Sequence, residues 1–77
     1  MTATADAEAR RAEAARALEQ AGQRRADAET AVQEATEHLR QAVLAARAAG
    51  ISVRRCAELG GVAPSTVTSW EARAGLG

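Results

Sequence analysis

Large apolar side chains are distributed unevenly along the 77-residue chain. Residues 1–38 contain only Met1, Leu18 and Val32, whereas ten large apolar residues lie among residues 39–77. A domain this small buries only roughly 60% of the surface that its unfolded chain exposes, so its core residues must lie close together. The pattern therefore predicts a helical oligomerisation segment over residues 1–38 and a compact helical domain over residues 39–77.

A long helix is predicted from about Thr4 to Ala49. This segment lacks proline and is rich in Ala, Glu, Arg and Gln, which are strong helix formers. Thr4 or Asp6 is expected to cap its first turn, and Gly50 is expected to end it in a left-handed conformation. At ~1.5 Å per residue, a helix of about 45 residues would be on the order of 68 Å long, too long for one core helix of so small a domain.

A heptad register, with positions a to g, gives this helix a surface for a second helix. Leu18, Val32 and Leu39 share position a, and six consecutive alanines occupy position d. The repeat favours a coiled-coil dimer, although Arg11 and Arg25 also fall at position a. The sequence leaves the relative direction of the two helices open. It also leaves open an alternative in which the 22 alanines fill the register by chance and the first 30 residues form an unpaired helix. The expected interface residues are Leu18, Ala21, Ala28, Val32, Ala35 and Leu39.

The first of two short helices is predicted over residues 53–59. Ser52 is expected to cap its beginning, and the pair Gly60–Gly61 is expected to end it. Ala57 is small enough to lie where two helices touch, and Cys56 occupies a position that suits a buried apolar side chain. The pattern predicts a tight turn directly after this helix.

The second short helix is predicted from Pro64 to about Ala74. Proline suits the first helical position, whereas Ala63 before it has no side-chain oxygen with which to cap the helix. Val67 and Trp70 are three residues apart and are expected to face the core. The predicted fold class is therefore all-α, with a long coiled-coil-like N-terminal helix followed by a compact helix-turn-helix.

Residues 53–72 resemble the helix-turn-helix family found in bacterial and phage repressors, resolvases, invertases and transposases. The segment AELGGVAPSTVTSW is similar to the family's pattern of a small residue, a turn glycine and then V-S-P-S-T-V-x-x-W. Ala63 stands where the family often has serine. The resemblance implies a DNA-binding domain whose second short helix enters the major groove.

The resemblance also implies which side chains would meet DNA. Residues on the exposed face of the second helix would contact base edges, and Thr66 would lie closer to the DNA backbone. None of them is Arg, Asn or Gln, so only modest sequence specificity is expected. Arg54 and Arg55 are the best phosphate candidates, with Arg47 and Arg73 flanking them; scattered surface arginines on a solvated helix face are the alternative. The expected DNA-binding set is Ser52, Arg54, Arg55, Ala63, Pro64, Ser65, Thr66, Thr68, Ser69 and Arg73.

Charge and chemistry narrow the function further. Residues 1–38 carry eight acids and five arginines, a net charge of −3. Residues 39–77 carry two acids and five arginines, a net charge of +3. Such asymmetry indicates a nucleic-acid-binding half. One cysteine, Cys56, and one histidine, His38, are too few for an ordinary zinc site, and no phosphate-binding glycine loop occurs. We expect no enzyme activity, cofactor or metal.

The unpaired cysteine and the lack of an apolar leader or membrane-spanning run predict a cytoplasmic location. The sequence thus predicts a small DNA-binding protein, a dimeric transcriptional regulator with residues 63–73 as its recognition helix. Its expected partners are double-stranded DNA and a second copy bound through the N-terminal helix. The alternative is a coiled-coil adaptor or assembly subunit, such as a phage packaging-type DNA recognition subunit, whose helical hairpin docks protein.

Overall fold

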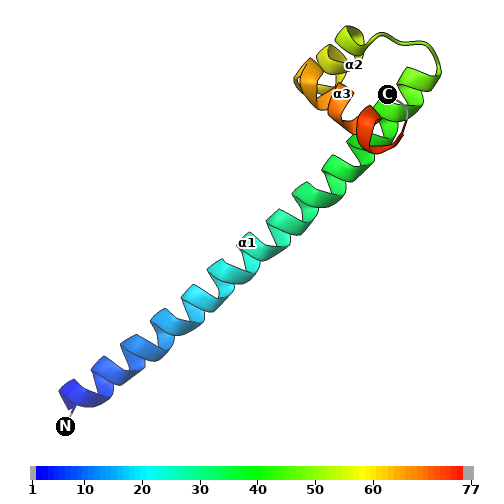
Figure 1. The fold of residues 1–77 in the computed structure, drawn as a ribbon. Helices are drawn as coiled ribbons and strands as arrows, with labels where there is room; N and C mark the ends of the chain where they lie inside the picture. The colour runs from blue at the N-terminus through cyan, green and yellow to red at the C-terminus, as the bar shows by residue number, and fades with distance from the viewer. Residues whose placement is uncertain (1, 76–77) are drawn as a thin grey trace. The chain divides into compact units, whose positions relative to one another are not determined.

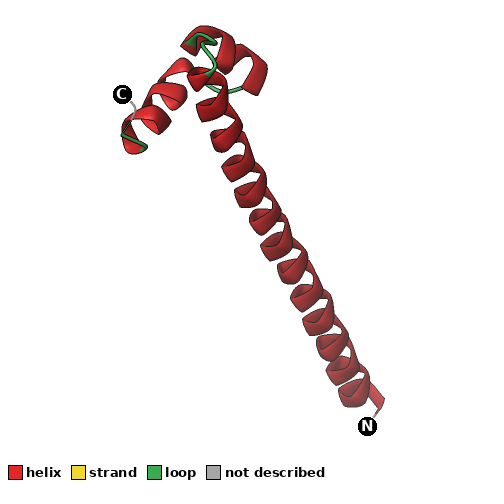
Figure 2. Cartoon of the chain, turned by 90° about the vertical axis from the view of Figure 1, so that its right-hand side faces the viewer, coloured by secondary structure: helices red, strands yellow, loops and turns green. Residues whose placement is uncertain are grey.

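A computed structural model of the protein describes residues 2–75; Met1, Leu76 and Gly77 lie outside the described residues. Its helices are α1 (Thr2–Ala48), α2 (Val53–Gly60) and α3 (Pro64–Arg73) (Figure 1). Short turns connect them, and the described part of the chain contains no strand (Figure 2). The all-α class, with one long N-terminal helix followed by two short ones, is therefore confirmed.

α1 begins earlier than the sequence predicted. Thr4 and Asp6 lie inside the helix, so the expectation that one of them caps it is wrong. Ala3, Ala5 and Ala7 alternate with these polar residues, and alanine has the highest helix propensity of all residues. The helical conformation therefore continues through the two candidate caps.

The chain divides into two compact units, of which the first ends at Val32 and the second begins at Gln33. In the first unit none of the described side chains is buried, and Leu18 and Val32 are 74% and 64% exposed. Its ion pair is local, because Arg25 donates to a carboxylate one turn away. Exposed pairs of this kind contribute only about 0.3–0.5 kcal/mol. Helix propensity is therefore the main stabilising term in this unit as a single chain.

The core of the protein lies in the second unit. Val43 from α1, Cys56 and Ala57 from α2, and Val67 from α3 are buried, and Val67 is fully inaccessible. This confirms that Cys56 and Ala57 occupy the contact between helices. Burying one valine side chain contributes roughly 1.5–3 kcal/mol. The half-buried residues packed around this core are Leu39, Ala46, Ile51, Val53, Val62 and Trp70.

The connection from α1 to α2 has the predicted chemistry. Gly50 adopts a φ of 95°, and the Ile51 amide donates back to the carbonyl of Ala46 at 3.0 Å. Ile51 also packs against the core, as expected after a left-handed helix end. The Ser52 hydroxyl accepts a hydrogen bond from the Arg55 amide at 3.1 Å, which confirms Ser52 as the cap of α2.

The turn between α2 and α3 is short and tight. Gly61 has a φ of 66° in the left-handed region, and the Val62 amide donates to the Ala57 carbonyl at 3.1 Å. Ala63 precedes α3 without a side-chain capping bond, and Pro64 holds the first helical position. Both short helices end within one residue of their predicted ends. This turn sets the direction in which α3 leaves α2.

Candidate nucleic-acid interface

The outer face of α3 carries small and mostly polar side chains. Val67 points into the core, whereas Thr66 is half-buried between the core and the surface. The structure therefore brings together the residues predicted to meet base edges, with Thr66 nearer to the core. The exposed residues of this face are Ala63, Pro64, Ser65, Thr68 and Ser69.

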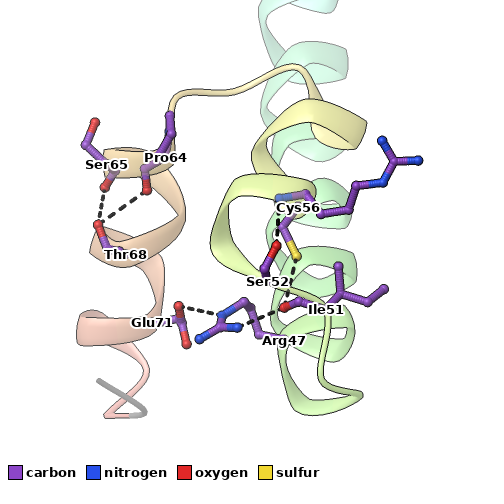
Figure 3. A network of polar contacts seen from close by, with 9 residues as sticks. Arg47, Ile51, Ser52, Cys56, Pro64, Ser65, Thr68 and Glu71 are labelled. Carbon is purple, nitrogen blue, oxygen red and sulfur yellow. Dashed lines mark hydrogen bonds and ion pairs between the residues drawn. The ribbon is translucent and has the colours of Figure 1, made fainter.

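The Thr68 hydroxyl is already engaged within its own helix. Its Oγ1 lies 3.0 Å from the Ser65 carbonyl oxygen and 3.4 Å from that of Pro64 (Figure 3). A hydroxyl has one hydrogen to donate, so Thr68 keeps only its acceptor capacity for a ligand. Within the described chain, the hydroxyls of Ser65 and Ser69 make no side-chain hydrogen bond. The free donors on this face are therefore Ser65 and Ser69.

One carboxylate is shared by the two arginines of α2. Glu58 Oε1 lies 3.6 Å from Arg54 Nε, and Glu58 Oε2 lies 3.3 Å from Arg55 Nη1. The two guanidinium side chains remain 89% and 59% exposed, so they can still be reached by a large ligand. The three side chains together carry a charge of about +1 rather than +2. Glu58 therefore competes with any phosphate group for both arginines.

The remaining two residues of the predicted DNA-binding set are Ser52 and Arg73. Ser52 is exposed, but its oxygen is occupied as the cap of α2. Arg73 lies in the last turn of α3, where a cation interacts favourably with the helix dipole. No ion pair involves Arg73 within residues 3–75. Arg73 is therefore the arginine of the second unit with the least intramolecular competition.

Arg47 has a different position from the one expected of a phosphate ligand. Its Nε donates to Glu71 Oε1 at 3.0 Å and its Nη1 donates to the Ile51 carbonyl at 2.8 Å (Figure 3). The side chains of Arg47 and Glu71 are only 30% and 13% exposed. This half-buried network joins the end of α1 to α3. Sequence spacing gave no signal for it, because the two partners are 24 residues apart.

A shallow apolar groove of about 230 Å³ lies between the end of α1 and α2. Leu59, at its edge, is 64% exposed. Apart from the Cys56 thiol, no polar side chain lines the groove, so it offers no acid–base pair. Its lining residues are Leu39, Ala42, Val43, Ala46, Cys56, Leu59 and Gly60.

The described residues give no basis for a metal site. They contain no group of three or more His, Cys, Asp or Glu side chains that could hold a metal ion. Among residues 2–75, no helix combines the length and the apolar character needed to cross a membrane. The outer face of α3 is the surface that gathers several exposed polar side chains.

Comparisons with protein-family models, with curated proteins and with solved structures found no match for this chain. The helix-turn-helix resemblance therefore stays a prediction from residues 53–72 alone.

Proposed function

We propose that the protein binds double-stranded DNA, without catalysis, through α2 and α3 of its second unit. One observation carries the proposal: the outer face of α3 is exposed and hydroxyl-rich, while Val67 on its inner face is fully buried. A helix held in this way by a second helix can enter the major groove. Residues 63–73 would then form the recognition helix.

Base contacts would come from small side chains. Ser65 and Ser69 can donate or accept hydrogen bonds at base edges, and Thr68 can accept one. Ala63 can touch a thymine methyl group. Because a bidentate base reader is missing from this set, we expect modest sequence selectivity, supplemented by DNA shape and flexibility.

Phosphate contacts would come from Arg54, Arg55 and Arg73. The amide groups that follow Ser52 at the start of α2 can add backbone contacts, because helix N-termini attract phosphate. If a dimer makes about five phosphate contacts, its affinity should fall by roughly 10²–10³ between 50 and 200 mM salt. The binding energy would therefore be mainly electrostatic.

We further propose that two copies act together as a transcriptional regulator, joined through position a and position d of α1. The exposed Leu18 and Val32 support this pairing, because both fall at heptad position a, where a coiled coil buries apolar side chains. A regulator of this kind would work in the cytoplasm. Pairing would double the number of phosphate contacts and so strengthen a weak single site.

A second candidate function is that of an adaptor or assembly subunit whose helical hairpin docks protein. The apolar groove beside the exposed Leu59 favours it, because apolar patches of this kind occur at protein interfaces. The partial neutralisation of Arg54 and Arg55 by the single carboxylate of Glu58 also fits a surface that needs little positive charge. Both functions can coexist in a packaging-type DNA recognition subunit.

Charge reversal of Arg54→Glu together with Arg55→Glu tests the DNA-binding proposal. The control carries Arg10→Glu and Arg16→Glu, which make the same charge change in the first unit. Binding to a pool of random duplexes is measured by fluorescence anisotropy, and mass is measured by light scattering. We expect the α2 variant to lose binding at unchanged mass and the control to retain it. Equal loss in both variants, or no binding by the unmutated protein, would overturn the proposal.

A further inference from the structure

Thr68 differs from the serines of the α3 surface in how its hydroxyl group is held. The residue is exposed, and its Oγ1 lies 3.0 Å from the Ser65 carbonyl oxygen and 3.4 Å from that of Pro64 (Figure 3). A threonine in a helix divides mainly between two side-chain rotamers, and one of them allows this bond to the preceding turn. The hydrogen bond therefore selects one rotamer of Thr68.

The same rotamer fixes the direction of the Thr68 methyl group. Oγ1 and Cγ2 are bonded to one tetrahedral carbon, so turning Oγ1 back to the helix carbonyls turns Cγ2 away from them. Because Thr68 is exposed, a ligand on the outer face of α3 can reach this methyl group. A side chain already held in one rotamer loses little conformational entropy when it binds. Thr68 therefore presents a preoriented apolar contact.

Pro64 extends this apolar contact along the helix. It is exposed and lies four residues before Thr68, a spacing that makes two residues neighbours on one side of a helix. Ser65 and Ser69 are related by the same spacing and carry the free hydroxyl groups of the surface. Ala63 adds a methyl group just before the first helical turn. The surface thus places apolar groups beside hydroxyl groups.

We propose that Thr68 makes this surface selective for thymine, through contact between its methyl group and the C5-methyl group of the base. The inference rests on the proposed binding of double-stranded DNA through α3 and names the base that is read. In the major groove the C5-methyl group belongs to thymine alone among the four bases, and threonine methyl groups suit contact with it. Thr68 is then a specificity-determining residue.

The hydroxyl group of Thr68 discriminates less well than its methyl group. Its hydrogen is donated to the helix, so the oxygen can only accept a hydrogen bond from a base. Adenine and cytosine both present an amino donor in the major groove, so an acceptor alone does not separate them. Ser65 and Ser69 can donate or accept and are still more permissive. Apolar contact is therefore the readout that matches a single base, and Thr68 supplies it within the helix.

The contact should change affinity by a measurable factor. Moving one methyl-sized group out of water corresponds to a factor of about 4 in affinity. A dimer that contacts two thymines in this way would show a factor of about 16. Both factors exceed what is needed to separate two titrations of matched DNA.

Thymine and uracil differ only in the C5-methyl group, so two matched DNA pools test the proposal. Duplexes that the unmutated protein selects from a random pool are copied once with thymine nucleotides and once with uracil nucleotides. Both pools are titrated by fluorescence anisotropy with the unmutated protein, Thr68→Ser and Thr68→Val. Serine keeps the hydroxyl group and lacks the methyl group, whereas valine has the shape of threonine and lacks the hydroxyl group. The three residues have similar helix propensities, and circular dichroism checks that α3 stays folded.

We expect the unmutated protein and Thr68→Val to bind the uracil pool about 4- to 16-fold more weakly than the thymine pool, and Thr68→Ser to lose this preference. Comparing the three proteins isolates the contact, because any effect of uracil on DNA shape is common to all of them. Equal affinity of the unmutated protein for both pools, or an unchanged preference in Thr68→Ser, would overturn the thymine readout and leave the DNA-binding proposal intact. Failure of the unmutated protein to bind any duplex would instead overturn the DNA-binding proposal, and the readout with it.

Discussion

Replacing Glu58 by glutamine should strengthen DNA binding. Glu58 bonds both Arg54 and Arg55, so a phosphate group must displace this carboxylate before it can pair fully with either arginine. Glutamine keeps the size of the side chain and removes its charge. The variant therefore isolates the electrostatic competition from any change in shape.

The size of the effect follows from the two ion pairs. Exposed pairs of this kind contribute about 0.2–1 kcal/mol each, so releasing both arginines should gain about 0.4–2 kcal/mol. This corresponds to roughly 2- to 30-fold tighter binding per α2–α3 hairpin. At 3.3 and 3.6 Å both contacts are longer than ideal charged hydrogen bonds, so the lower half of this range is expected.

The assay is a fluorescence anisotropy titration of labelled duplex at two salt concentrations. Glu13→Gln, an exposed site in the first unit, is the matched control for the change in net charge. Circular dichroism checks that α2 stays folded, because Glu58 also stabilises that helix by about 0.2–0.5 kcal/mol per pair. If Glu58→Gln and Glu13→Gln raise affinity equally, the shared carboxylate does not compete with DNA and the reasoning is refuted.

Two further predictions concern stability, and both are read by thermal unfolding followed by circular dichroism. Arg47→Ala should cost about 1–3 kcal/mol, because it leaves the Glu71 carboxylate and the Ile51 carbonyl without their donor. Tm should fall by roughly 4–8 °C per kcal/mol, and an unchanged Tm would contradict the structural role of Arg47. Gly61→Ala should destabilise by about 1–2 kcal/mol, since Gly61 has a φ of 66° with open space around it. Gly22 is equally unobstructed but lies within a helix, so Gly22→Ala should instead stabilise α1 by about 1 kcal/mol. If both glycine variants changed stability in the same direction, the argument from backbone conformation would be contradicted.

Local chemistry made most of the fold predictable. Ser52 caps α2, Gly50 and Gly61 adopt positive φ, and Pro64 begins α3, as their residue types require. Each of these features depends on residues within one turn of the chain. The start of α1 was missed because the alanines around Thr4 extend the helix past a good capping residue. Propensity over several residues outweighed one capping bond.

The candidate site was less predictable because one of its arginines, Arg47, makes a contact between helices. Arg47 looked like a phosphate ligand in the sequence, and only folding brings Glu71 beside it. The competition from Glu58 had a signal, because Arg54 and Arg55 precede it by four and three residues on one helix. The division of roles between residues 1–38 and 39–77 stays a prediction, as do the contacts with DNA.

The most direct test of the account is the salt dependence of duplex binding by the unmutated protein. With about five phosphate contacts per dimer, the plot of log affinity against log salt should have a slope of roughly −4.5. The affinity should then fall by about 10²–10³ between 50 and 200 mM salt. Binding that does not change with salt, or no binding at 50 mM, would contradict the proposal that α2 and α3 bind DNA.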